Sequence, residues 1–149
     1  MKTRAATVLV TGTFDVLHGG HIAHFKQAKR YGKRLVVLVA RDETVKRLKG
    51  QRPYFNEQQR CALLRELKIV DVVVLGDLKD PLRVIKRLKP DVICLGHDQK
   101  IFVDLLEGCK GRLPFYVRVL RSKPVLRGVY RSKNIKHHYA VDKRKSGGI

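Results

Sequence analysis

The sequence predicts a single α/β domain in which helices cover both faces of a five-stranded parallel sheet. Short, nearly continuous apolar runs alternate with amphipathic stretches along the chain, and apolar runs of this kind are typical of parallel strands buried on both faces. A glycine-rich segment stands between the first apolar run and the first amphipathic stretch, where such a fold has a strand-to-helix turn. A length of 149 residues suits one domain with its own core.

The apolar runs define the expected strands, which are rich in Val, Ile and Leu. These strands cover residues 6–10, 34–40, 70–75, 91–95 and 115–120. In an open parallel sheet, ligands bind beyond the carboxyl ends of the strands. We therefore expect the segments that follow the first and fourth strands to lie at the same edge and to contribute to one site.

Turn and capping residues mark the helices between the strands. Gly32 is placed as a stop after the first helix. Asp42 and Asn56 stand where N-caps are expected, and Pro81 occupies a first helical turn. The expected helices cover residues 20–31, 42–48, 56–67, 81–88 and 101–106, with a last helix from residue 132.

The charge of the chain favours polyanionic partners. Lys and Arg outnumber Asp and Glu by 33 to 13, so the formal net charge is +20. Such a field attracts phosphorylated small molecules and nucleic acids alike. Part of the charge lies in the run 143–145, and we expect a folded domain over residues 1–142 followed by a basic flexible tail over 143–149.

Composition also excludes several classes of protein. No apolar run approaches the roughly 20 residues that span a bilayer, and the N-terminus lacks a signal-peptide core. We therefore expect a cytoplasmic protein with no membrane partner. The three cysteines, Cys61, Cys94 and Cys109, have no metal-like spacing, so we expect buried reduced thiols.

Residues 12–21 carry the chemistry of a polyphosphate site. They read Gly-Thr-Phe-Asp-Val-Leu-His-Gly-Gly-His and lie between the first strand and the first helix. A helix N-terminus offers unpaired backbone N–H groups and the positive end of the helix dipole. Glycines let a phosphate approach the backbone closely, and His18 and His21 can donate hydrogen bonds to its oxygens near neutral pH.

Residues 12–15 and 18–21 resemble the GTFD and HxGH signature of the cytidylyltransferase-like nucleotidyltransferases. That superfamily joins a nucleoside triphosphate to a phosphorylated alcohol and releases pyrophosphate. The resemblance covers most of the chain and identifies residues 1–142 as a nucleotidyltransferase domain. It implies the same Rossmann-like α/β/α sandwich that the alternating pattern predicts.

The resemblance extends to the basic segment before residues 57–60, which read as an E-x-x-R helix start. In relatives a lysine of this segment meets the phosphates. By position Lys49 and Arg52 are the candidates for this contact, and Lys46 is less favoured; a solvated basic face is the alternative. Arg60 corresponds to the helix arginine that helps to fix the active-site loops.

Two later segments complete the resemblance. Residues 96–99 are similar to a Gly-x-Asp stretch in which Asp98 faces the acceptor or the base, although a plain strand-end turn also fits. Residues 127–132 keep the arginine-to-serine spacing of the R-T-E-G-I-S-T/S element. Ser132 would then meet the β- and γ-phosphates, and Arg127 or Arg131 would neutralise charge on the leaving pyrophosphate. The residues between them depart from the family pattern, which leaves the nucleotide open.

The candidate site therefore has three groups of residues. The catalytic candidates are His18, His21, Lys49 and Arg127. The nucleotide-binding candidates are Thr13, Phe14, His18, Gly20, His21, Arg131 and Ser132. The candidates at the acceptor or the site edge are Asp15, Arg52, Arg60 and Asp98. The sequence shows no carboxylate cage for a metal, so Mg²⁺ is expected to arrive with the nucleoside triphosphate.

Three branches of the superfamily fit the sequence. Residues 40–46 together with 96–99 look closest to small archaeal-type FAD synthetases, so we favour transfer of a nucleotidyl group from ATP to FMN. CTP:glycerol-3-phosphate cytidylyltransferase is the second choice because of residues 127–132. A sugar-phosphate adenylyltransferase is the third because of the Lys-Arg-Leu-Lys-Gly run at 46–50 with Arg52 and Pro53.

A different class of function also stays open. A basic RNA-associated protein on this scaffold would explain the +20 charge, and non-specific nucleic-acid binding could accompany either function. Relatives often pair, so a homodimer is compatible with the resemblance.

Overall fold

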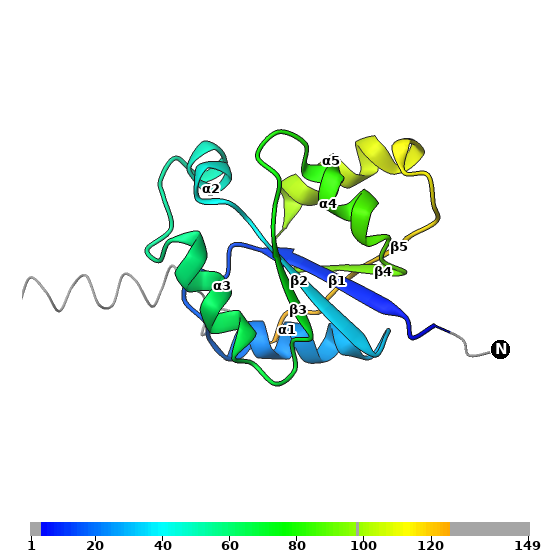
Figure 1. The fold of residues 1–149 in the computed structure, drawn as a ribbon, viewed down its shortest axis with the longest axis horizontal. Coiled ribbons are helices and arrows are strands. Elements are labelled where there is room, and N and C mark those ends of the chain that lie inside the picture. Colours follow the sequence, from blue (N-terminus) through cyan, green and yellow to red (C-terminus); the bar gives the residue numbers. More distant parts are fainter. Residues whose placement is uncertain (1–3, 98, 126–149) are drawn as a thin grey trace, which may run out of the picture.

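The computed structural model describes residues 4–97 and 99–125 (Figure 1). Five parallel strands form one sheet in the order β3-β2-β1-β4-β5. The strands are β1 (Thr7–Gly12), β2 (Arg34–Val39), β3 (Val72–Leu75), β4 (Val92–Leu95) and β5 (Arg118–Arg121). The chain builds the sheet outward on one side of β1 and then on the other, which confirms the predicted Rossmann-like α/β fold.

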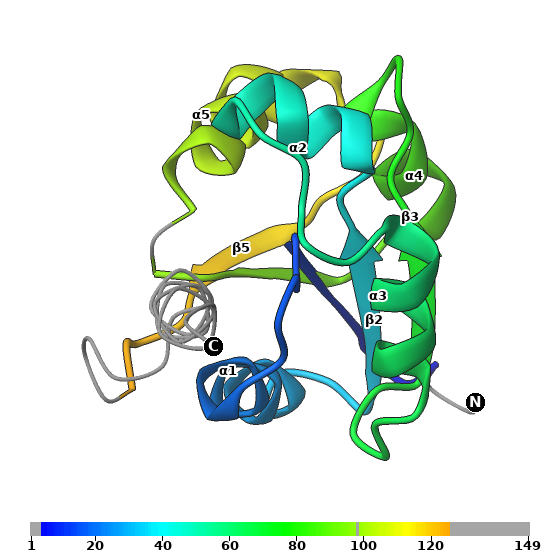
Figure 2. The same cartoon turned by 90° about the vertical axis from the view of Figure 1, so that its left-hand side faces the viewer.

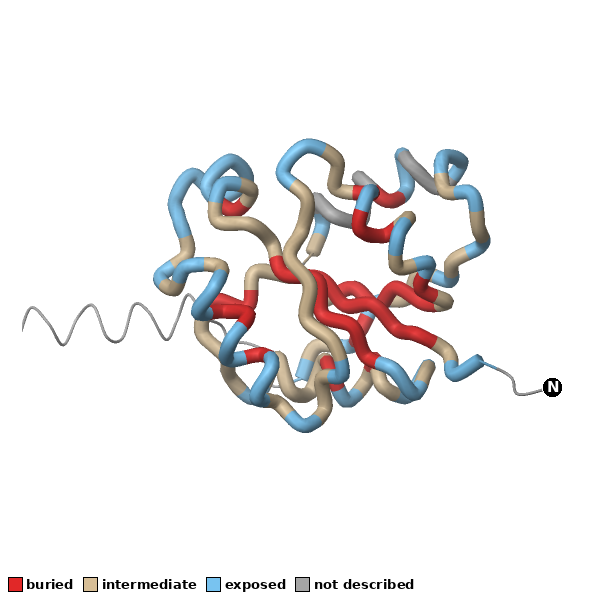
Figure 3. The backbone as a smooth tube through the Cα atoms, in the orientation of Figure 1, coloured by how far each residue is buried: buried red, intermediate tan, exposed pale blue. Residues whose placement is uncertain are grey.

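Helices cover both faces of the sheet (Figures 1 and 2). They are α1 (Gly19–Lys29), α2 (Asp42–Lys49), α3 (Glu57–Arg65), α4 (Pro81–Leu88) and α5 (Lys100–Cys109), followed by the 3₁₀ turn η1 (Lys110–Arg112). Alternate residues of the strands point to opposite faces. Val8 and Val10 join the apolar cluster under α1 and α3, whereas Leu9 joins the cluster under α4 and α5. The buried strands thus lie between two layers whose outer surfaces are exposed (Figure 3).

Most element boundaries agree with the sequence predictions to within a few residues. Asn56 caps α3 through a 2.9 Å hydrogen bond from the Gln59 N–H, and Pro81 opens α4. The prediction that Asp42 caps α2 is wrong: Arg41 is the N-cap and makes no side-chain cap bond. The Asp42 carboxylate instead accepts hydrogen bonds from residues of α3. The expected helix from residue 132 and the tail at 143–149 lie outside the described residues.

Gly32 has a different role from the predicted helix stop. The C-cap of α1 is Arg30, in a right-handed conformation, and Gly32 does not have a left-handed φ. A Cβ atom on Gly32 would lie 2.5 Å from the carbonyl oxygen of Ala6 and 2.7 Å from Cγ2 of Val8. Glycine is therefore required because the α1–β2 connection passes close against the backbone that leads into β1.

The cysteine prediction is confirmed for the two described thiols. Cys61 and Cys94 are reduced and buried in the cluster under α1 and α3, and burial raises the pKa of both thiols. The side chain of Cys109 lies outside the described part. Across the described residues, no helix is long and apolar enough to cross a membrane.

Substituting Gly32→Ala should destabilise the protein by about 1–3 kcal/mol, because backbone atoms must move to make room for the methyl group. Gly108→Ala is the matched control, since no atom lies within 4 Å of the place that its Cβ would take and the residue is exposed on α5. That change should stabilise by about 0.5–1 kcal/mol through helix propensity. Urea unfolding measures both, and equal midpoints for the two variants would contradict this account of Gly32.

Candidate active site

Two imidazoles form the cap of α1 at the carboxyl edge of the sheet. His18 is the N-cap residue, and its Nδ1 accepts a hydrogen bond from the Gly20 N–H at 3.1 Å. Nδ1 of His21 accepts from the His18 N–H at 3.4 Å, which completes a reciprocal capping box. The two rings stack with their centroids 3.9 Å apart. The start of α1 is thus held by the same residues that the sequence identifies as phosphate ligands.

These caps also determine the tautomers of the two rings. Because Nδ1 accepts a hydrogen bond in each ring, the proton of the neutral imidazole lies on Nε2. Burial lowers the pKa of His18 below its usual value, so this ring is neutral near pH 7. The neutral His18 ring can then donate through Nε2–H, which is the form that the predicted contact with a phosphate oxygen requires.

Phe14 shapes the turn that precedes the histidines. It has a left-handed backbone, with φ of 51°, and its side chain is 5% exposed. Its ring packs against Phe25 at 5.4 Å and against His21 at 5.3 Å between centroids. Burial of the ring offsets the strain of the left-handed conformation, which is on the order of 1 kcal/mol. The Phe14 side chain therefore lies in the core and orients His21, so that its contribution to nucleotide binding would come from the backbone.

The structure brings Lys49 to the same turn. Lys49 is the last residue of α2, and its Nζ donates to Oγ1 of Thr13 at 3.2 Å. The two residues are 36 positions apart in the sequence, yet both belong to the predicted site. Arg52 forms an ion pair with Glu43 in which both side chains are about half exposed. The two predicted phosphate contacts thus differ, since Lys49 bonds to the turn between β1 and α1 and Arg52 is held by a carboxylate of α2.

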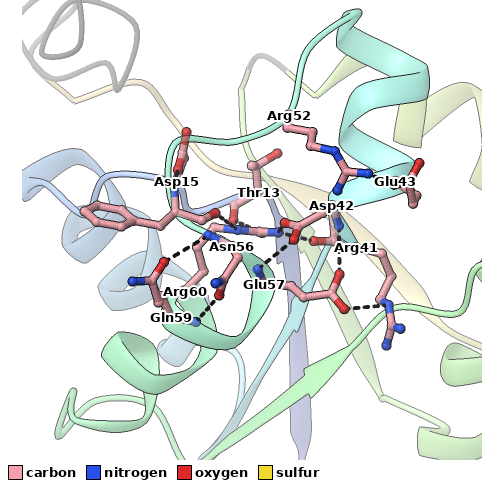
Figure 4. A network of polar contacts seen from close by, with 12 residues as sticks. Thr13, Asp15, Arg41, Asp42, Glu43, Arg52, Asn56, Glu57, Gln59 and Arg60 are labelled. Carbon is pink, nitrogen blue, oxygen red and sulfur yellow. Dashed lines mark hydrogen bonds and ion pairs between the residues drawn. The ribbon is translucent and has the colours of Figure 1, made fainter.

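Arg60 joins this turn to the loops that precede α2 and α3 (Figure 4). The residue is fully buried. It donates to the carbonyl oxygens of Phe55, Thr13 and Ala40 at 3.1, 2.6 and 2.9 Å, and to Oδ1 of Asp42 at 2.7 Å. These contacts agree with the expected role of this arginine in fixing the active-site loops.

Asp15 also joins the β1–α1 turn to the segment before α3. Its side chain is buried, and the two carboxylate oxygens accept hydrogen bonds from the N–H groups of Tyr54 at 2.8 Å and Phe55 at 2.9 Å. The segment before α3 is therefore anchored to the first turn by Asp15 and by Arg60. Both residues, predicted for the acceptor or the site edge, have positioning roles in this structure.

Gln99 is a positioning residue that sequence reasoning did not select. Its Nε2 donates to the carbonyl oxygen of Thr11 at 2.6 Å, while its Oε1 accepts from the Gly96 N–H at 2.8 Å. The ends of β1 and β4 are thus joined at one edge, as the parallel sheet predicts. The signal that could have identified Gln99 is its position next to Asp98, in the segment predicted to follow the fourth strand.

His24 and Gln27 hold the segment that follows β5 against α1. Nδ1 of His24 lies 2.9 Å from Oγ of Ser122. Gln27 makes two hydrogen bonds to the backbone of Lys123, of 3.0 and 2.8 Å. Sequence reasoning missed both residues, although His24 follows His21 at helical spacing. Their contacts anchor the start of the segment that carries later candidates. Asp98, Arg127, Arg131 and Ser132 lie outside the described residues.

The described part of the chain contains no group of three or more His, Cys, Asp or Glu side chains placed to hold a metal ion.

Comparison with known proteins supports the resemblance found in the sequence. A family model described as cytidylyltransferase-like matches residues 9–145. The chain is 44% identical to an FAD synthase of Thermoplasma volcanium over 76% of this chain and 80% of that protein. It is 41% identical to an FAD synthase of Methanohalophilus mahii over 78% of this chain and 82% of that protein.

A solved structure shows the same fold. It is a crystal structure described as a lipopolysaccharide core biosynthesis protein from Thermoplasma volcanium. The TM-score is 0.76 at 41% identity, and the match covers 82% of this chain and 99% of that one.

Arg60→Met should destabilise the protein by about 3–5 kcal/mol, because it leaves three carbonyls and a carboxylate without their donor. Arg65→Met is the matched control, since Arg65 is exposed on the same helix, and it should change stability by about 0.5 kcal/mol or less. Thermal or urea unfolding compares the two. Similar losses in both variants would show that the Arg60 contacts contribute little to stability.

Acid should weaken the fold through His18. Burial lowers the pKa of this ring in the folded chain. As the pH falls below about 6.5, the unfolded chain therefore takes up a proton that the folded chain binds less readily. Protonation of Nδ1 would also remove the acceptor for the Gly20 N–H. Between pH 7 and pH 5, wild type should lose more unfolding free energy than His18→Asn, whose side chain does not titrate; an equal loss would argue against this role.

Proposed function

The chain belongs to the cytidylyltransferase-like family, and from this premise we propose that it transfers AMP from ATP to FMN, forming FAD and pyrophosphate. It is a nucleotidyltransferase, and its substrates are a nucleotide and a flavin. Relatives named FAD synthase, at 44% and 41% identity over about four fifths of their length, support this choice of substrates. The observation that carries the chemistry is the α1 N-terminus, where His18 and His21 are held by their own capping bonds. Lys49 bonds to Thr13 of the same turn.

The reaction is an in-line displacement at the α-phosphorus of ATP. A phosphate oxygen of FMN attacks this phosphorus, the bond to the oxygen that bridges to the β-phosphorus breaks, and pyrophosphate leaves with the electron pair. No protein nucleophile is needed, because the acceptor phosphate is already an anion. Catalysis then depends on positioning the two substrates and on neutralising charge in the transition state.

The residues of the first turn would supply both effects. His18 and His21 donate from Nε2 to oxygens of the α-phosphoryl group as it becomes pentacoordinate. The backbone N–H groups at the start of α1 add their partial positive charge. Lys49, which bonds to Thr13, neutralises phosphate charge. Arg52 is a second cation for this purpose if the acceptor displaces Glu43.

Three residues outside the described part would act on the leaving group. Ser132 would hydrogen-bond the β- and γ-phosphates, and Arg127 or Arg131 would neutralise the pyrophosphate as it departs. Asp98 would orient a hydroxyl of a substrate. Mg²⁺ bound to the triphosphate would supply additional charge neutralisation, since phosphate oxygens are the hard ligands that this ion prefers.

A sugar-phosphate adenylyltransferase is the second candidate. It is favoured by the solved relative described as a lipopolysaccharide core biosynthesis protein, at 41% identity. The same displacement chemistry would serve that acceptor, so substrates must be compared directly.

Pyrophosphate release from matched pairs of substrates tests the proposal. ATP and CTP are each incubated with FMN, glycerol 3-phosphate and a sugar 1-phosphate, and FAD is measured separately by chromatography. ATP with FMN should release pyrophosphate and form FAD in equal amounts. Pyrophosphate release only with another pair would replace the FMN assignment, and release with none would overturn the enzyme assignment.

Two further proposals concern the oligomeric state of the protein and its binding to nucleic acid. We propose a homodimer, which analytical ultracentrifugation tests. We also propose weak non-specific binding to nucleic acid, driven by the +20 charge. It should disappear by about 0.5 M salt, because phosphate contacts weaken steeply as counterions are added.

His18→Asn separates catalysis from helix capping. Asparagine is a strong N-cap, so the start of α1 should persist, while the ring donor is lost. We expect kcat to fall about a hundredfold or more, which corresponds to about 3 kcal/mol for one transition-state donor. His21→Ala should lose activity to a similar extent. Lys26→Ala, an exposed position of the same helix, is the control and should keep full activity. A His18→Asn enzyme with wild-type kcat would exclude a catalytic role for this ring.

A further inference from the structure

We propose that a pocket at the ends of β2 and β3 binds the isoalloxazine ring of FMN, a proposal that rests on the function proposed above. The pocket has a volume of about 280 Å³. It is lined by Arg41, Gly76, Asp77, Leu78, Lys79 and Arg83. Arg41 follows β2, and Gly76 follows β3. Its lining residues therefore lie at the same carboxyl edge as the His18 turn, and Figure 1 shows α2 and the β3–α4 loop at this edge.

The separation between the two places matches the length of FMN. The reacting phosphate must lie at the β1–α1 turn, where His18 and His21 are placed. Because neighbouring strands lie about 4.8 Å apart, the end of β3 is roughly 10 Å from the end of β1. Seven bonds connect the FMN phosphorus to the ring atom N10, and with single bonds of about 1.5 Å an extended ribityl chain spans about 9 Å. A phosphate held at β1 thus places the ring beyond β3.

On the other side of β1, a side chain joins the ends of β1 and β4. There the side chain of Gln99 lies between β1 and β4 and bonds to Thr11 and Gly96 at 2.6 and 2.8 Å. On the β2 and β3 side, the edge opens into the pocket instead. We therefore place the ribityl chain over β2, between the His18 turn and the pocket.

The pocket lining suits a flat ring with a polar end. The pyrimidine end of isoalloxazine presents carbonyl oxygens and ring nitrogens, whereas its dimethylbenzene end is apolar. The ammonium group of Lys79 makes no ion pair or hydrogen bond with the rest of the described chain, so it can donate to a ligand carbonyl. Arg41 and Arg83 each carry a planar guanidinium, a group that stacks on aromatic faces. Leu78, which is 45% exposed, offers apolar contact.

Asp77, the acidic residue of the pocket lining, does not repel the carbonyl oxygens of such a ligand. Oδ1 of Asp77 accepts hydrogen bonds from the N–H groups of Lys79 and Asp80, each at 2.8 Å. Its Oδ2 pairs with Arg83 at 3.0 Å. These bonds lower the pKa of Asp77, and they shape the loop while holding Arg83 at the wall of the pocket.

Arg41 connects the pocket to the reacting turn. Its Nε lies 3.2 Å from Oε1 of Glu57, and Oε2 of Glu57 accepts from the Asp42 N–H at 2.8 Å. Asp42 in turn binds Arg60, which holds the carbonyl of Thr13. Figure 4 shows Arg41 on the far side of Glu57 from Arg60. The wall of the pocket and the turn between β1 and α1 are therefore joined by one polar network.

Riboflavin is the probe that tests the ring site, because it carries the ring and the ribityl chain without the phosphate. Its binding to the intact protein is followed by flavin fluorescence. Lys79→Ala and Arg83→Ala should each weaken riboflavin binding and raise KM for FMN about tenfold, as expected for the loss of a charged hydrogen bond. KM for ATP and the melting temperature should stay near wild type. Arg87→Ala, an exposed position on α4 outside the pocket lining, should bind riboflavin normally.

The possible outcomes separate this inference from the proposed function. Wild type that binds riboflavin through Lys79 and Arg83 but forms no FAD would overturn the proposed function and keep the ring site. Wild type that forms FAD while both variants bind riboflavin unchanged would overturn the ring site. An equal loss in Arg87→Ala, or an equal rise in KM for ATP, would also overturn it, since general electrostatic attraction would then explain the effect.

Discussion

The buried guanidinium of Arg60 is the interaction on which the arrangement of the site depends. It binds the carbonyl oxygens of Thr13, Ala40 and Phe55, which belong to three separate loops, together with the carboxylate of Asp42. A buried cation needs partners for its charge and its donors, so the loops can satisfy Arg60 only in one relative position. The turn with the histidines is thereby fixed against α2 and α3.

Acidic side chains at this edge are engaged by the protein itself. Asp15 holds two backbone N–H groups, Asp42 pairs with Arg60, and Asp77 closes the β3–α4 loop. Lys49, by contrast, bonds to the hydroxyl of Thr13 and makes no ion pair with a carboxylate of the described residues. That arrangement suits a reaction between two phosphate anions, because like charges must be brought together before the bond can form.

In the proposed two-substrate reaction, the phosphates and the flavin ring lie at the ends of different strands. In the proposed reaction the phosphates react at the end of β1, the central strand, which has β2 and β4 as neighbours. The gap between β1 and β4 is bridged by Gln99, whereas the β2 and β3 side opens into a basic pocket. One rigid edge can therefore orient an acceptor as long as FMN without movement of a domain.

The sequence by itself determined the features that depend on local pattern. Apolar runs identified five parallel strands, Asn56 and Pro81 marked helix starts, and residues 12–21 marked the turn between β1 and α1. The tertiary structure alone decided what depends on contacts between distant segments. It showed that Asp42 serves Arg60 instead of capping α2, that Gly32 is needed against β1, and that Lys49 reaches Thr13. Periodicity and capping act over a few residues, whereas these contacts exist only after the strands have paired.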